Sequence, residues 1–122
     1  MDIRIGTVSS VNYNTATVKV VFKDRDNIVS KDLPLLRFEY NPPIVGDSVL
    51  CVFYARGRGI CLGTFFNNNN PPNSSGENIY RKDFDSDSFL EYDKNLKSLT
   101  ISVNDIILDG NITITGDLQV NG

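Results

Sequence analysis

Asp105-Ile106-Ile107-Leu108-Asp109-Gly110 runs without interruption into Asn111-Ile112-Thr113-Ile114-Thr115-Gly116 and then Asp117-Leu118-Gln119-Val120-Asn121-Gly122. Each hexad has Asp or Asn first, apolar residues second and fourth, and glycine sixth. This fixed period is typical of one face of a β-helix or β-prism, in which glycine allows a turn that a Cβ atom would obstruct. The alternative is an ordinary pair of strands with glycines six residues apart. Because all three hexads keep every position, the pattern favours the β-helix.

One chain cannot bury the apolar positions of these hexads. Ordering the backbone of the whole repeat costs more conformational entropy than the burial of six aliphatic side chains returns. Three copies wound around one axis bury these side chains and also pair the strand edges, so we predict a homotrimer. The residues expected at the trimer axis are Ile106, Leu108, Ile112, Ile114, Leu118 and Val120, and the expected repeat turns are Gly110, Gly116 and Gly122.

The segment before the hexads predicts a change of architecture. Residues 67–78 are rich in Asn, Pro and Ser and offer little to anchor a core, so we interpret them as a stiff, extended linker. Short alternating segments follow at 78–84, 88–92 and 99–103. We therefore expect residues 79–122 to form β-strands that lead into the hexad-repeat trimeric β-helix.

Residues 1–66 show a period of two, which is typical of half-buried strands, and no sustained helical spacing. The sequence predicts an all-β chain whose first domain, residues 1–66, is a small closed barrel of the OB or SH3-like kind, because closure removes exposed sheet edges. The hairpin formed by 48–54 and 60–66 is apolar at nearly every position, so we expect cover on both of its faces. The faces expected on the first two strands are Ile3, Ile5, Thr7, Ser9 and Val11, and Ala16, Val18, Val20 and Phe22.

Composition excludes several classes of function. The chain of 122 residues has a formal net charge of −3, with +2 on residues 1–66 and −5 on residues 67–122. It lacks the overall basic character that favours nucleic acid or anionic lipid. It also lacks histidine, the commonest metal ligand and the usual proton carrier near neutral pH. We expect a soluble protein without a leader peptide, since the longest apolar run, at 49–55, is too short to cross a bilayer.

Few residue clusters suggest chemistry. Asp83, Asp85 and Asp87 alternate, and we interpret them as a solvated acidic strand face rather than a calcium site, because the EF-hand glycine and terminal glutamate are missing. Cys51 and Cys61 lie in apolar strands and are expected to be reduced core thiols, with a disulfide as the alternative. No serine has a histidine to activate it. We predict no catalytic residue, no cofactor and no metal site.

The turn Arg56-Gly57-Arg58-Gly59 is the strongest local signal in the first domain. Two cations at a hairpin tip suit a phosphate or an acidic protein surface, so Arg56 and Arg58 are candidate partner contacts. The alternative is a turn built from glycine in which the arginines provide solubility. Small barrels also bind single strands by stacking bases on aromatic side chains, and this gives an alternative function, an OB-fold module for single-stranded nucleic acid. The aromatic residues available for stacking are Phe22, Phe38, Tyr40, Phe53 and Tyr54, most of which fit a core position better.

Several segments follow one another in a recognisable order: Arg4-Ile5-Gly6-Thr7-Val8, residues 18–26, Leu33-Pro34-Leu35-Leu36, residues 43–50, residues 59–67 and Pro71-Pro72. Each segment is weakly specific alone, whereas their order and spacing are specific together. Taken in order, they resemble the phage baseplate assembly protein V family, the central spike proteins of contractile tails, with relatives in tailocins and among the valine-glycine repeat proteins of type VI secretion.

The resemblance implies a structural protein rather than an enzyme. In that family an OB-fold domain trimerises as a collar beneath the tail tube, and the strands after it form a trimeric β-helical spike that punctures the target envelope. The implied partners are tail tube and baseplate hub proteins at the N-terminal end, a separate PAAR-type tip protein at the C-terminal end, and transiently the target envelope, with no nucleic acid. The implied location is the bacterial cytoplasm during assembly and then the baseplate of a virion or phage-tail-like particle.

The chain departs from some members of the family. A lysozyme domain that some members insert between barrel and needle has no room in residues 67–78. The iron-binding His-x-His apex of others is absent because the chain has no histidine. The needle is short and stops in phase at Gly122, which implies either a separate tip protein or a truncated chain.

Overall fold

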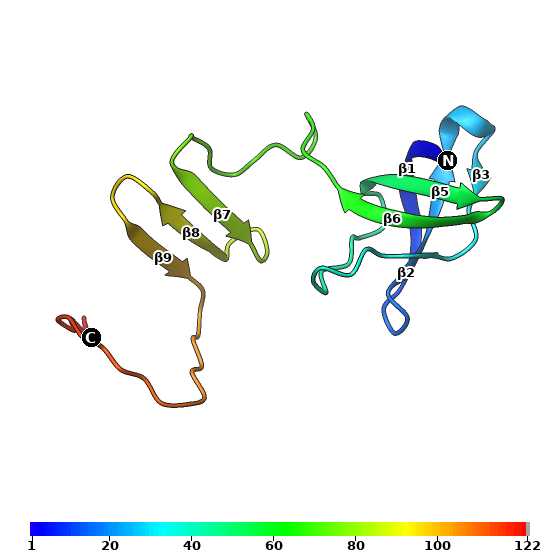
Figure 1. Ribbon diagram of the computed structural model, residues 1–122. Helices are drawn as coiled ribbons and strands as arrows, with labels where there is room; N and C mark the ends of the chain where they lie inside the picture. Colours follow the sequence, from blue (N-terminus) through cyan, green and yellow to red (C-terminus); the bar gives the residue numbers. More distant parts are fainter. Residues whose placement is uncertain (122) are drawn as a thin grey trace. The chain divides into compact units, whose positions relative to one another are not determined.

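A computed structural model describes residues 1–121 of the chain (Figure 1). The prediction of an all-β protein is confirmed: strands and loops account for the described residues, apart from one 3-10 turn, η1, at Lys23–Arg25. The chain divides into two compact units, Met1–Pro72 and a second that begins at Asn73. Within residues 1–121 no helix is long and apolar enough to cross a membrane.

The first unit is a curled antiparallel sheet. Its strands are β1 (Asp2–Asn12), β2 (Thr17–Phe22), β3 (Ile28–Val29), β4 (Leu33–Pro34), β5 (Ser48–Ala55) and β6 (Arg58–Thr64). The pairing order is β3-β2-β1-β5-β6, and β4 pairs separately with β2. Just after β4, Leu35 forms a parallel bridge with Cys61 of β6, and the Leu36 N–H donates to the Cys61 carbonyl at 3.0 Å. The sheet therefore closes on itself through β4 and β6.

The core of the first unit lies inside this closed sheet. The predicted face of β2 is confirmed for Val18, Val20 and Phe22, each at most 1% exposed. Gly6 is required where β1 passes close to β2, because a Cβ there would lie 2.4 Å from Val20 Cγ1. The buried core consists of Val8, Val18, Val20, Phe22, Leu33, Val49, Cys51 and Cys61.

The expected face of β1 is wrong in part. Ile3 and Ile5 are 67% and 59% exposed, while Val8, on the opposite face, enters the core. A register shift between Val8 and Ser10 then brings Val11 opposite Val18, where it packs against the core. A β-bulge of this kind inserts one residue and reverses the alternation of faces, so a strict period of two cannot follow the strand.

Arg4, near the start of β1, is a charged residue at the edge of the core. Arg4 lies over the rings of Phe53 and Phe22, with the guanidinium carbon 4.9 and 5.6 Å from the two ring centroids. Its Nε donates to Asp2 at 2.7 Å, and this hydrogen bond lowers the pKa of the Asp2 carboxyl. The cation is thus held by aromatic rings and a carboxylate at the edge of the core.

The hairpin of β5 and β6 is present, but the expectation that both of its faces are covered is wrong for a single chain. Val49, Cys51 and Cys61 are fully buried on the inner face. Leu50 and Val52, which point to the opposite face, are only half-buried. The apolar character of that second face therefore has no explanation inside the chain.

The second unit holds a three-stranded antiparallel meander, β7 (Ile79–Asp83), β8 (Phe89–Asp93) and β9 (Ser98–Ser102). Asp93 shapes the turn after β8 by accepting hydrogen bonds from the N–H groups of Asn95 and Leu96. Residues 103–121 form no strand with any other described part of the chain. The division between the units falls inside residues 67–78.

The alternating aspartates do not form a strand face, which corrects the sequence interpretation. Asp83 ends β7, whereas Asp85 and Asp87 lie in the turn between β7 and β8. The Asp85 Oδ1 accepts the N–H of Asp87 at 2.8 Å and that of Ser88 at 2.7 Å. These backbone hydrogen bonds lower the pKa of Asp85, so its role is to stabilise the turn.

Candidate self-assembly surfaces

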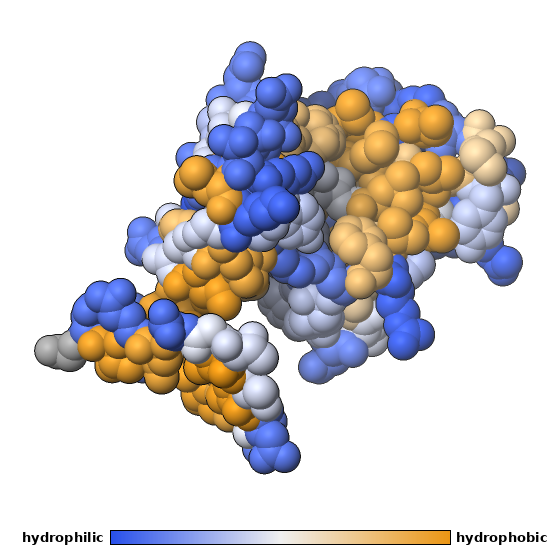
Figure 2. All heavy atoms as spheres, turned by 60° about the vertical axis from the view of Figure 1, so that its left-hand side comes forward, coloured by the Kyte–Doolittle hydropathy of each residue, from blue (hydrophilic) through white to orange (hydrophobic). Residues whose placement is uncertain are grey.

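The hexads present their apolar side chains to solvent. The six residues predicted at the trimer axis are between 54% and 78% exposed, with Ile114 the least exposed and Val120 the most. Figure 2 shows apolar side chains along one side of the C-terminal segment. Nothing in the described chain covers them, because residues 103–121 pair with no strand. Six aliphatic side chains at regular spacing in water form an apolar surface of the kind that marks an interaction site.

The predicted repeat turns differ from one another. Gly110 has a φ of 148°, a value that favours glycine, whereas Gly116 has no such φ. A Cβ atom at either position would meet no heavy atom of the described part of the chain within 4 Å, its own chain neighbours apart. Within one chain, therefore, no steric contact requires these glycines. The third predicted turn residue, Gly122, lies outside the described residues.

A second uncovered apolar surface lies on the meander, and the sequence analysis did not identify it. The register places Tyr80, Tyr92 and Leu99 in one cross-strand row, and Lys82, Leu90 and Ile101 in the next. Cross-strand partners share a face of the sheet, so the five apolar residues of these rows, with Lys82 at one edge, form one surface, here called the second-unit apolar face. Tyr80, Leu99 and Ile101 are 58%, 56% and 44% exposed. The signal was in the sequence, but only the register shows which apolar residues share a row.

The opposite face of the meander is already satisfied within the chain. Arg81 donates to Asp83 at 3.0 Å and to Glu91 at 3.0 Å, and its guanidinium carbon lies 3.8 Å from the centroid of the Phe89 ring. Partial burial opposes the charge of Arg81, but its hydrogen bonds to Glu91 and Asp83 outweigh this effect and raise its pKa. The meander is thus a sheet with one self-contained polar face and one uncovered apolar face.

A third surface of the same kind lies on the outside of the first unit. Ile3 pairs with Val52, which in turn pairs with Ile60, and Ile5 pairs with Leu50. These five aliphatic residues, here called the first-unit apolar face, cross β1, β5 and β6 on the side away from the core. Figure 2 shows the first unit with apolar side chains at its surface. An uncovered aliphatic patch on three adjacent strands favours association with another protein surface.

The predicted cationic tip is present. Arg56 and Arg58 lie at the turn that joins β5 to β6, are exposed, and flank Gly57, whose φ is 71°. Arg56 also lines an open groove of about 430 Å³ beside Arg4 and Lys31. Both cations are therefore open to solvent, and their role as partner contacts stays a prediction.

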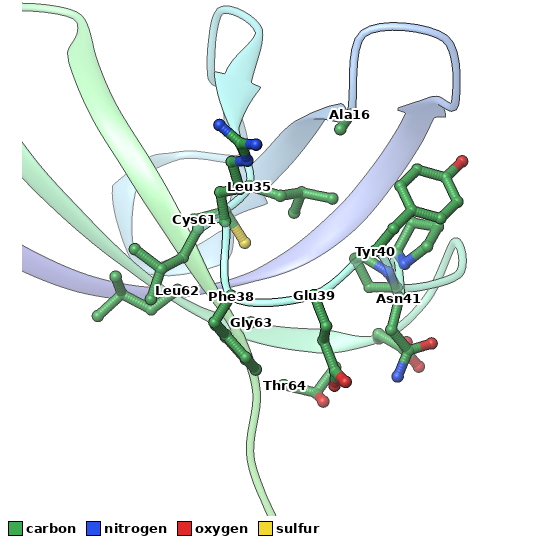
Figure 3. Close-up of a pocket in the computed structure, with 15 residues that line it drawn as sticks. Ala16, Leu35, Phe38, Glu39, Tyr40, Asn41, Cys61, Leu62, Gly63 and Thr64 are labelled. Atoms are coloured by element: carbon green, nitrogen blue, oxygen red, sulfur yellow. The ribbon is translucent and has the colours of Figure 1, made fainter. Parts of the chain in front are cut away.

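A larger open groove of about 670 Å³ lies between the loop after β4 and the end of β6 (Figure 3). Phe38, Glu39, Tyr40 and Asn41 line it from the loop, opposite residues 61–64 of β6. The loop is anchored by the Tyr40 hydroxyl, which donates to the Tyr13 carbonyl at 3.2 Å. Within residues 1–121, no cluster of three or more His, Cys, Asp or Glu side chains is placed to hold a metal ion.

Comparison with known proteins adds no family. No protein-family model matches the sequence, and no curated protein matches it either.

Proposed function

We propose that this chain is the structural central spike, or hub, of a contractile injection system, a phage tail or tailocin baseplate component that caps the tail tube and punctures the target envelope. The observation that carries the proposal is the hexad segment, in which the six predicted axis positions are exposed and residues 105–121 pair with no described strand. A β-prism of three chains gives these side chains a common axis and gives each extended segment two neighbours. The protein then acts mechanically and not as an enzyme.

The connectivity of the first unit supports an OB-fold collar. β1 pairs with both β2 and β5, and β4 pairs antiparallel with β2. The segment after β4 runs parallel to β6 at the Leu35–Cys61 bridge. A five-stranded Greek-key barrel requires a closed path of this kind. β3, with two residues, is then an appendage at the edge of the sheet.

The second-unit apolar face supports a continuous trimer contact along the spike. It precedes the hexads in sequence and, like them, has apolar residues with no cover in the chain. Its polar reverse side, closed by Arg81, would then face water. A prism with paired backbone groups and an acidic exterior transmits axial force without buckling, and its charge resists adhesion to anionic envelopes.

The partners follow from this arrangement and from the family resemblance. The collar would meet tail tube and baseplate hub proteins, for which Arg56 and Arg58 are candidate contacts, and a tip protein would meet the C-terminal end of the hexads. Assembly would take place in the bacterial cytoplasm, before incorporation into a virion or tail-like particle.

The absolute mass in dilute solution tests the proposal. Light scattering coupled to size exclusion should give three times 13.6 kDa, about 41 kDa, and the mass should persist on dilution. A stable monomer would contradict the spike. Such a monomer should then be tested for binding of single-stranded DNA. If its affinity fell steeply with salt and required Arg56 and Arg58, the function would be that of a module for single-stranded nucleic acid and not that of a spike.

A further inference from the structure

Two cysteines face each other across the hairpin of β5 and β6. Cys51 and Cys61 are direct register partners, and both are free thiols with 0% exposure. Residues directly opposite in an antiparallel pair have Cα atoms about 4.5 to 5.5 Å apart. A disulfide requires about 4.4 to 6.8 Å between Cα atoms, so the strand pairing itself supplies the spacing.

The two thiols also interact with each other. Their hydrogen bond raises the pKa of Cys51, to which burial adds, while the same bond lowers the pKa of Cys61. Cys61 is accordingly the better nucleophile of the pair, because a hydrogen bond from a neighbouring thiol stabilises its thiolate. Cys51, the thiol that would complete a disulfide, is thus also the group that activates Cys61 as a nucleophile.

We propose that Cys51 and Cys61 form a modification site, a cross-strand disulfide that closes when the chain meets a low-molecular-weight disulfide such as oxidised glutathione. The Cys61 thiolate attacks one sulfur of the oxidant, forms a mixed disulfide and releases one thiol. The Cys51 thiol then loses its proton and displaces the second, so two cysteine thiols and one oxidant disulfide give one protein disulfide and two small thiols. Because both cysteines are buried, the exchange proceeds through opening of the hairpin and is slower than for exposed thiols.

The position of the pair gives the bridge a structural consequence. Cys61 accepts the N–H of Leu36 and forms the parallel bridge with Leu35, so it sits at the point where the sheet closes. Cys51 lies opposite Arg4 of β1. A covalent link between them would fix both strands next to the closure and hold it against opening. This inference concerns the first unit alone and does not depend on the proposed function.

The test uses the full wild-type chain, refolded with oxidised glutathione and, in parallel, with a reducing agent. We expect the oxidised chain to lose about 2 Da relative to the reduced chain and to gain no glutathione. Trypsin cleaves after Arg56 and Arg58, so the peptides 38–56 and 59–81 should remain joined until reduction. The midpoint of thermal unfolding should rise by about 10 °C and return on reduction.

The single variants Cys51→Ala and Cys61→Ala are the matched controls. Each should keep one thiol or carry one glutathione, and neither should show the reversible rise in the unfolding midpoint. Three results on the oxidised wild-type chain would each overturn the proposal. They are two thiols that can still be alkylated, a stable glutathione adduct, and a disulfide between chains. The mass and the peptide linkage are read on the wild-type chain, so the test holds even where a variant fails to fold. Because thiol state and oligomer mass are separate measurements, failure of one inference leaves the other standing.

Discussion

The two units are built from the same element, short antiparallel strands, but they solve the burial problem differently. The first encloses a core of eight buried apolar residues inside a sheet that closes through Leu35 and Cys61. From Asn73 to Asn121 no residue is fully buried, although apolar residues are frequent in that part of the chain. Alternation alone therefore does not make a unit self-sufficient; a sheet must also close, or receive a second layer.

The largest effect is expected from charge placed on the hexad positions that are predicted to lie at the trimer axis. The double variant Ile112→Asp, Ile114→Asp would bring six carboxylates together at the axis of a trimer, where burial of unpaired charge costs several kcal/mol for each group. We expect the trimer mass to be lost at micromolar concentration. Light scattering measures the change.

The matched control changes the intervening positions of the same hexad. Thr113→Asp, Thr115→Asp adds the same charge to the side chains that point away from the axis, and the trimer mass should persist. If both double variants assembled equally well, the hexads would not form the shared prism.

The core of the first unit should respond to cavities regardless of assembly. Phe22 is 1% exposed and its ring lies 5.8 Å from that of Phe53 in an edge-to-face arrangement. Phe22→Ala should lower the free energy of unfolding by about 3 to 5 kcal/mol, measured by denaturant titration. The loss should be the same at low and high protein concentration. A loss that disappeared on dilution would show that this core, too, depends on partner chains.

A smaller effect is expected from a methyl group at Gly6. A Cβ there would lie 2.4 Å from Val20 Cγ1 and 2.8 Å from the Val21 carbonyl oxygen, so either β1 or β2 must shift. Gly6→Ala should cost about 1 to 3 kcal/mol in the first unit by denaturant titration. Gly116→Ala is the contrast, because a Cβ there meets nothing within 4 Å among residues 1–121. Any destabilisation by Gly116→Ala would therefore report a contact with another chain.

The smallest effect concerns pH and the turn between β7 and β8. Hydrogen bonds from the N–H groups of Asp87 and Ser88 lower the pKa of Asp85 in the folded chain. The ionised Asp85 carboxylate therefore stabilises the fold fully at pH values above the pKa that this carboxyl has in the unfolded chain. This stabilisation is lost as pH falls through the lower pKa that it has in the folded chain. Thermal unfolding between pH 6 and pH 2 should show this loss, and Asp85→Asn should flatten that part of the profile. A carboxyl titration of Asp85 at or above its ordinary pKa would refute the assignment.

Strand positions were predictable from the sequence wherever one face was clearly apolar. Val18, Val20 and Phe22 alternate with polar or less buried residues, and the core does lie on their side of β2. For β1 both faces offered candidates, and Arg4 and Gly6 disguised the inward one. A polar side chain can face inward when aromatic rings and a carboxylate receive it, and a period of two contains no such information.

Turn chemistry and register limited the rest. Asp83, Asp85 and Asp87 look like an alternating strand, but an aspartate that captures backbone N–H groups two and three residues ahead makes a turn instead. The second-unit apolar face depends on which residues lie opposite one another across three strands, and spacing within one strand does not specify that. The hexad pattern repeats along the chain itself and needs no register to be seen, but the trimeric β-helix predicted from it stays a prediction.

The self-sufficient core lies at the start of the chain, and the exposed hexads come after it. Because synthesis begins at the N-terminus, the first unit is made before the hexads. In the proposed trimer, its unimolecular folding would precede the association of three chains. That association would depend steeply on concentration, and the hexads would stay exposed until it is complete. The order of synthesis would thereby separate a fast, unimolecular folding step from a slower assembly step that depends on concentration. Low expression would delay the assembly step alone.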